Sequence, residues 1–293
     1  MVFGIVVSSI VVGKMIELFT PQNLAFAATG VAGFAFVVTV IALHGMEPDI
    51  VTHDANVGVE IAPTTTANFL AAIGEIWQEP LARRFTIFVF LSMVAYSAQD
   101  LILEPFGGLV FGMSPSETTK MSGLQHGGVL LGMILTGALG GRSTKSGSGW
   151  MQTWAIFGCL ASALALAGLG AAALIGPAWP LKPTVFILGF ANGVFAVSAI
   201  GSMMGLAGTG RSAREGTRMG IWGAAQAIAF GLGGFLGASG VDVLRKLLPQ
   251  TGDAFFAIFT IEAAMFVAAA YVASQLNVGQ IIVSTRVRAG AAS

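Results

Sequence analysis

Charged residues are scarce in this sequence. Its 293 residues are 55% hydrophobic and only 10% charged, with a mean hydropathy of +0.82, whereas a soluble domain carries about 25% charged residues. This composition excludes an ordinary soluble domain and predicts a polytopic membrane protein. Because the formal net charge is zero, the sequence offers no basic excess for nucleic acid, and we expect no nucleic-acid partner.

Cysteine is almost absent too. The single thiol, Cys159, lies in an apolar run, so the chain cannot form an intrachain disulfide or a multi-cysteine metal cluster. The sequence shows no Ser–His–Asp order and no clustered metal ligands. Its glycine-containing stretch at 208–216 follows an apolar helix rather than a strand, which argues against nucleotide binding. We therefore predict no enzyme activity, no catalytic residue, no bound metal and no covalent cofactor.

Long apolar runs are abundant instead. A transmembrane helix needs about 20 apolar residues, and eight stretches of the sequence meet this requirement. They are expected at about 1–18, 24–45, 85–107, 117–140, 150–176, 183–206, 219–240 and 254–276. The predicted fold class is an all-α polytopic membrane protein with about eight transmembrane helices.

Lysine and arginine predict the orientation of these helices, because cytoplasmic loops carry an excess of both. With residues 46–84 in the cytoplasm, nine basic residues lie on that side: Arg83, Arg84, Arg142, Lys145, Arg211, Arg214, Arg218, Arg286 and Arg288. Five lie on the other side: Lys14, Lys120, Lys182, Arg245 and Lys246. Both ends of the chain are therefore expected in the cytoplasm, with residues 277–293 as a cytoplasmic tail.

Residues 46–84 form the one long loop between the expected spans. Their first half is polar, with Pro and Thr clusters. The second half places apolar side chains at helical spacing, namely Phe69, Leu70, Ile73, Ile76 and Trp77. This pattern predicts an amphipathic helix at the membrane interface. The chain thus divides into two helices (1–45), a cytoplasmic linker (46–84), a six-helix unit (85–276) and the tail.

Six helices after a long cytoplasmic linker resemble the second half of a major facilitator superfamily transporter. Three stretches more specifically resemble the PucC family, the (bacterio)chlorophyll-delivery or light-harvesting assembly branch of that superfamily. They are QDLILEPFGGLVFGMSPSETTKMSG, GFANGVFAVSAIGSMMGLA and REGTRMGIWGAAQAIAFGLGG. Members usually have twelve helices, so about four upstream helices are expected to be missing. A fragment, a start assigned late or a natural short form would each account for this.

The resemblance implies a protein of the bacterial inner (photosynthetic) membrane that delivers (bacterio)chlorophyll to light-harvesting complexes or assists their assembly. (Bacterio)chlorophyll would be bound cargo. The implied partners are membrane lipid, light-harvesting antenna polypeptides and pigment-synthesis enzymes. Two alternatives stay open: a proton-coupled facilitator-type transporter of another small molecule, and a membrane assembly chaperone that transports nothing.

Two carboxylates within one expected helix are the first site candidates. Asp100 and Glu104 lie one turn apart, beside Gln99, and each costs about 2.5–3.5 kcal/mol near the centre of a helix in lipid. Such groups belong where they line a wet cavity or are buried in protein. We expect either a cavity-lining, pigment-binding role or a structural network between helices.

The same helix carries a candidate break. Pro105 has no N–H, so the carbonyl of Leu101 loses its helical partner. Gly107 and Gly108 follow directly. These residues predict a helix that is interrupted near its end.

The other polar candidates for the cavity lie on three further spans. His126 is expected at the depth of Asp100, either as its partner, as a ligand for the magnesium of a chlorophyll, or as a plain interhelical hydrogen-bonding group. Asn192 and Gln226 are candidates for contact with the cargo. Glu262 is a further buried carboxylate.

Charge and glycine patterns complete the set of candidates. Arg214, Glu215 and Arg218 are candidates for gating in a cytoplasmic loop, although topology alone also explains the basic residues. The glycine pairs Gly189/Gly193 and Gly201/Gly205 have the small-xxx-small spacing of close helix packing.

The orientation can be tested by cysteine labelling. Cysteines introduced at Ser146 and Ser212 are expected to resist a membrane-impermeant thiol reagent added to the periplasm of intact cells, because both loops are predicted in the cytoplasm. Labelling should appear only after the membrane is permeabilised. Ready labelling in intact cells would reverse the predicted topology.

Overall fold

The computed structural model describes residues 2–15, 20–43, 74, 77–142, 149–207 and 215–276. Within these ranges the regular structure is helical, and no strand occurs among them. The helices are α1 (Val2–Met15), α2 (Pro21–Leu43), α4 (Pro80–Phe111), α5 (Pro115–Arg142), α6 (Gly149–Ile175), the short 3₁₀ helix η1 (Gly176–Ala178), α7 (Leu181–Ala207), α8 (Glu215–Leu247) and α9 (Thr251–Ser274). The predicted all-α fold is confirmed.

Seven of the described helices, α2 and α4 to α9, are long and apolar enough to cross a membrane. The first expected span, at about 1–18, contains the shorter helix α1. Its 14 residues extend about 21 Å at 1.5 Å per residue, less than the ~30 Å of a hydrocarbon core. The next helix, α2, begins at Pro21, where the Thr20 hydroxyl accepts a hydrogen bond from the N–H of Asn23 at 3.1 Å, as an N-cap does.

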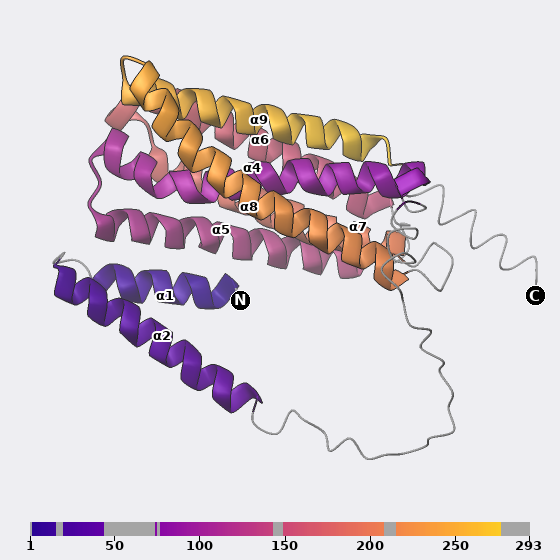
Figure 1. Ribbon diagram of the computed structural model, residues 1–293, viewed down its shortest axis with the longest axis horizontal. Helices are drawn as coiled ribbons and strands as arrows, with labels where there is room; N and C mark the ends of the chain where they lie inside the picture. Colours follow the sequence, from indigo (N-terminus) through magenta and orange to yellow (C-terminus); the bar gives the residue numbers. More distant parts are fainter. Residues whose placement is uncertain are drawn as a thin grey trace, which may run out of the picture.

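Helices α4 to α9 pack side by side as one bundle, α1 lies along α5, and α2 lies beyond α1 (Figure 1). Large apolar side chains cover the outside, for example Phe34 at 73% and Leu164 at 75% exposed, as expected of a surface that faces lipid. We call the two ends of the bundle the Pro80 end and the Phe111 end, after the first and last residues of α4. Helices α4, α6 and α8 run from the Pro80 end to the Phe111 end, and α5, α7 and α9 run back.

Helices α5 and α7 touch backbone to backbone. The contact is made by glycines on both helices, namely Gly128 and Gly132 on α5 and Gly189 and Gly193 on α7. A Cβ atom at any of the four would overlap a main-chain atom of the partner helix. In lipid, where apolar surface gains little from burial, such close packing drives helix association. The packing role predicted for Gly189 and Gly193 is confirmed, whereas Gly205 faces open space.

Helices α4 and α8 form a second close pair. Gly233 of α8 lies against the carbonyl of Val94, and Gly237 lies against Ala98. The hydroxyl of Ser97 also donates to the carbonyl of Phe230 at 2.7 Å. Contact between the two pairs, of α4 with α5 and of α7 with α8, is much sparser, and α6 and α9 join the pairs on one side.

Helix α4 does not break where the sequence predicted. The predicted break covered Pro105, Gly107 and Gly108. The helix instead continues through the proline to Phe111 and ends at Gly112, whose φ of 67° favours glycine. Proline removes one hydrogen bond, but the packing of its neighbour holds the helix together. The ring of Phe106 lies 5.2 Å and 5.0 Å from two phenylalanine rings of α9.

Parts of the predicted linker lie outside the described residues. Of the expected interfacial helix, only Gly74 and the residues from Trp77 onward are described, and the tail at 277–293 is not. The interfacial helix and the division of the chain into domains therefore stay predictions.

The α5–α7 contact predicts a strong position dependence for glycine substitution. Gly193→Ala would place a methyl group against the carbonyl of Val129, so the helices must separate, and we expect a loss of roughly 1–3 kcal/mol. Thermal unfolding in mild detergent measures the effect.

The matched control is Gly205→Ala on the same helix. Its new methyl group meets nothing within 4 Å, so the variant should be unchanged or slightly more stable, because alanine favours the helix by about 1 kcal/mol. Equal stability of the two variants would contradict the proposed importance of this contact.

Candidate functional site

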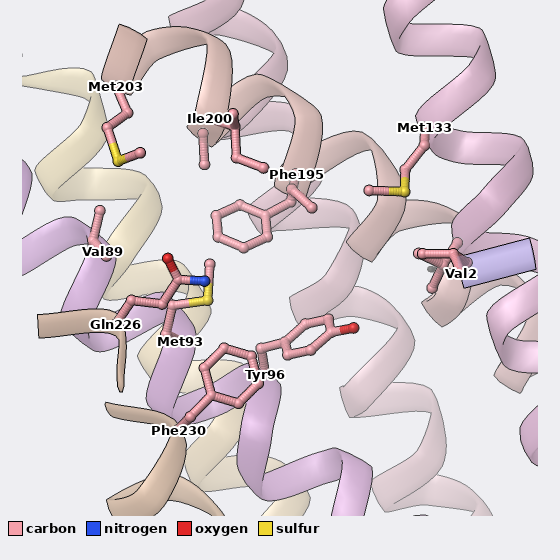
Figure 2. A pocket seen from close by; sticks show the side chains of 13 residues that line it. Val2, Val89, Met93, Tyr96, Met133, Phe195, Ile200, Met203, Gln226 and Phe230 are labelled. Carbon is pink, nitrogen blue, oxygen red and sulfur yellow. The ribbon is translucent and has the colours of Figure 1, made fainter. Parts of the chain in front are cut away.

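A cavity of about 210 Å³ lies between α4, α5, α7 and α8, in the half of the bundle nearer the Pro80 end. Its wall consists of Val2, Val89, Met93, Tyr96, Val129, Met133, Phe195, Ala196, Ala199, Ile200, Met203, Gln226 and Phe230. Figure 2 shows the rings of Tyr96, Phe195 and Phe230 and the amide of Gln226 around this space. The cavity therefore lies between the two glycine-joined helix pairs.

The cavity wall is largely apolar. Its methionines have flexible, polarizable side chains that adapt to irregular ligands, and its aromatic rings offer flat contact surfaces. The phenol of Tyr96 and the amide of Gln226 are the polar side chains in the wall. Gln226 was a sequence candidate. Tyr96 was not, because an aromatic side chain at helical spacing gives the same pattern in a packed core.

A group of three polar side chains, Asp100, Gln125 and His126, lies beside the cavity, one helical turn from Tyr96. The Nε2 of Gln125 on α5 donates to the carboxylate of Asp100 at 3.3 Å, and His126 is the next residue of α5. The Nδ1 of His126 lies 2.8 Å from the carbonyl oxygen of Ser122. A carbonyl only accepts, so Nδ1 carries the hydrogen and Nε2 remains for other partners. The structure brings Asp100 and His126 together and adds Gln125, which sequence reasoning missed.

Glu104 does not join this group. Its side chain is exposed on the bundle surface, whereas Asp100 is partly buried. The turn between them moves Glu104 about 6 Å toward the Phe111 end. The two carboxylates that the sequence treated as a pair therefore have different surroundings.

Gln99 and Asn192 are buried between helices and do not line the cavity. The Oδ1 of Asn192 accepts a hydrogen bond from the hydroxyl of Ser162 on α6 at 2.8 Å. Glu262 of α9 is also buried, at 2% exposure. Within the described ranges, no three His, Cys, Asp or Glu side chains gather as a metal site requires.

The candidate gating residues are only partly described. Arg214 and the side chain of Glu215 lie outside the described residues. Arg218, at the start of α8, is buried and forms an ion pair with Glu79, the residue before α4, at 2.5 Å. This ion pair joins α8 to α4 at the Pro80 end. Sequence reasoning could not find it, because 139 residues separate the partners.

A family model described as PUCC protein matches residues 1–281. The chain belongs to the PUCC family. Its match to a bacteriochlorophyll synthase 44.5 kDa chain of Rhodobacter capsulatus is 46% identical over 275 residues, 94% of this chain and 61% of the relative. Proteins named PucC from Cereibacter sphaeroides and Rhodovulum sulfidophilum are 28% and 30% identical, over 90% and 83% of this chain.

This PUCC-family chain spans about half to three-fifths of the length of these curated relatives, at 61%, 55% and 51%. The resemblance predicted from three sequence stretches is confirmed, and it extends over nearly the whole chain. One relative is named as a synthase chain, and that name applies to the relative alone. The absence of enzyme activity in this PUCC-family chain stays a prediction.

The Arg218–Glu79 ion pair predicts an asymmetric response to substitution. Glu79→Gln leaves a buried guanidinium without its partner, whereas Arg218→Gln leaves a carboxylate that is already 50% exposed. We expect Glu79→Gln to lower thermal stability in detergent more than Arg218→Gln does.

The double variant measures the ion pair itself. We expect a coupling free energy of about 1 kcal/mol, since one partner is open to solvent. Glu104→Gln, which removes an exposed carboxylate from α4, controls for net charge. Additive single effects would show that the ion pair does not stabilise this end of the bundle.

Proposed function

We propose that this chain binds (bacterio)chlorophyll dissolved in the membrane and hands it over during assembly of light-harvesting complexes. The observation that carries the proposal is the cavity between α4, α5, α7 and α8. Its apolar, methionine-rich and aromatic wall with two polar groups suits a lipid-soluble molecule with a few polar edges. A relative named as a bacteriochlorophyll synthase chain supports this choice of cargo.

The size of the cavity limits what it encloses. At about 210 Å³ it is smaller than the roughly 300–1,000 Å³ of pockets that bury a whole drug-sized ligand, and a pigment with a hydrocarbon tail is larger still. The cavity therefore takes one part of the pigment, the ring edge or the tail. The remainder lies in the lipid or against a partner.

Tyr96 and Gln226 are the groups we assign to the polar parts of the cargo. Both lie in the wall, and both offer oxygen atoms, which Mg²⁺ prefers as ligands. His126, the magnesium ligand suggested by the sequence, is not in the wall, and its Nδ1 lies 2.8 Å from the carbonyl oxygen of Ser122. We assign it a role in the polar group beside the cavity.

The predicted orientation places the Pro80 end in the cytoplasm. The cavity then lies in the cytoplasmic half of the inner, photosynthetic membrane, on the side where pigment-synthesis enzymes would supply the cargo. Antenna polypeptides are the receiving partners in this proposal. The apolar outside of the bundle offers them a lipid-like surface.

Pigment binding by a cavity-filling variant tests the proposal. Ala196, in the wall, is only partly buried, so Ala196→Phe should fill the cavity without overpacking the core. We expect at least tenfold weaker binding of bacteriochlorophyll to the purified chain, or about 1.4 kcal/mol, measured by absorption titration in mild detergent.

The matched control is Ala167→Phe, an exposed alanine on α6 that does not line the cavity. Binding should be unchanged in this variant. Equal binding by both variants and the wild type would exclude the cavity as the cargo site. Antenna polypeptides that co-purify with a chain that binds no pigment would favour the chaperone alternative.

A further inference from the structure

Six polar side chains from five helices lie at one depth in the middle of the bundle. They are Gln99 and Asp100 of α4, His126 of α5, Ser162 of α6, Asn192 of α7 and Glu262 of α9. We call this set the polar layer. It borders the cavity on the side nearer the Phe111 end.

The register of α4 and α9 places two members of the layer at the same level. These helices run antiparallel, and the ring of Phe106 packs on the rings of Phe255 and Phe259. Gln99 lies seven residues before Phe106 on α4, and Glu262 lies seven residues after Phe255 on α9. The two side chains are therefore level with each other in the interface.

Hydrogen bonds fix the level of α6 and α7. The amide of Gln152 on α6 donates to the carbonyl of Ala273 on the antiparallel α9 at 2.8 Å. Ser162 lies ten residues after Gln152, and Glu262 lies eleven residues before Ala273, so Ser162 and Glu262 share a level. The hydrogen bond from Ser162 brings Asn192 of α7 to the same depth.

The polar layer contains buried donors and acceptors that are not matched. Both carboxyl oxygens of Glu262, both polar atoms of the Gln99 amide and the Nδ2 of Asn192 are buried, and none has a hydrogen-bond partner within the described part of the chain. An isolated ionised carboxylate in such surroundings is very costly. A neutral carboxylic acid both donates and accepts, so a proton on Glu262 suits this position.

Other titratable groups near Glu262 are few within the described ranges. From α4, Asp100 follows Gln99 and accepts a hydrogen bond from Gln125 of α5, whose next residue is His126. From α6, the nearest is the thiol of Cys159, one turn from Ser162. On α8, Asp242 is exposed and lies nearer the Phe111 end.

The polar layer lies close to the middle of the membrane. Glu262 is eleven residues after Thr251, the first residue of α9, which is about 16 Å at 1.5 Å per residue. Half of a ~30 Å hydrocarbon core is about 15 Å. Ionisable groups at this depth are functional candidates by default.

We propose that the polar layer is a proton-binding site in which Glu262 holds an exchangeable proton and Asp100 is the acceptor. When the proton passes from the carboxyl of Glu262 to the carboxylate of Asp100, the negative charge moves to Glu262. The amide groups of Gln99 and Asn192 then serve as donors to that charge. The net charge of the layer does not change.

The proton site and the cavity are one turn apart on α4. Tyr96, in the cavity wall, lies four residues before Asp100 on the same helix. Cargo that packs against Tyr96 therefore changes the surroundings of the proton acceptor. This coupling rests on the proposed cargo function, whereas the proton site itself does not.

Infrared spectroscopy of the full chain tests the proton site without any pigment. In an ester-free detergent at mildly alkaline pH, exposed carboxyl groups are ionised. The wild type should still show the C=O band of a neutral carboxylic acid, shifted to lower frequency in D₂O. Glu262→Gln should lose this band, and Glu104→Gln, with its exposed carboxylate on α4, should keep it.

A second variant covers the case in which Glu262→Gln fails to fold. Asp100→Asn should keep the band but shift its frequency, because it removes the neighbouring charge. A wild type without the band overturns the proposal, and so does a band that persists in Glu262→Gln. A band that is unmoved in Asp100→Asn overturns the assignment of the acceptor.

Pigment titration at several pH values tests the coupling separately. Binding should depend on pH in the wild type and in Glu104→Gln, and this dependence should be lost in Glu262→Gln. If pigment binds without pH dependence while the infrared band is present, the proton site stands and the coupling is excluded. If no pigment binds, the cargo function fails and the infrared result still decides the proton site.

Discussion

The backbone contact between α5 and α7 is the interaction on which the rest of the bundle depends. Four glycines, Gly128, Gly132, Gly189 and Gly193, remove the side chains that would hold these helices apart. The contact sets the register of the two helices, so it fixes where His126 and Asn192 lie in depth. It also stiffens one wall of the cavity, which α1 supports by packing on α5 and α6 by packing on α7.

The polar layer draws its side chains from both glycine-joined pairs and from α6 and α9. Lipid provides no hydrogen bonds, so a polar side chain there must find a partner within the protein. Ser162 and Asn192 satisfy each other in part, and Gln125 satisfies Asp100. The carboxyl of Glu262 and the amide of Gln99 are buried without a hydrogen-bond partner among the described residues, and the proton site that we propose lies there.

The sequence predicted much of the fold and less of the site. Apolar run length located the long helices, and glycine spacing located the α7 side of the α5–α7 contact but not its partner helix. Gln226 was found because a polar side chain in an apolar helix stands out. Tyr96 and the level of Glu262 with Gln99 could not be found, because both depend on how separate helices align. Pro105 misled because one lost hydrogen bond is less costly than unpacking Phe106 from α9.

The two close helix pairs give the bundle an uneven stiffness. Within each pair, main chain rests on main chain, and compression would require atoms to overlap. Between the pairs, on the cavity side, the contact consists of deformable side chains and includes the hydrogen bond from Gln125 to Asp100. A bulky molecule entering the cavity would therefore displace one pair against the other as rigid units. The side bridged by the carboxylate of Asp100 is thus the side on which the bundle would open, while α6 and α9 keep the two pairs joined on the other.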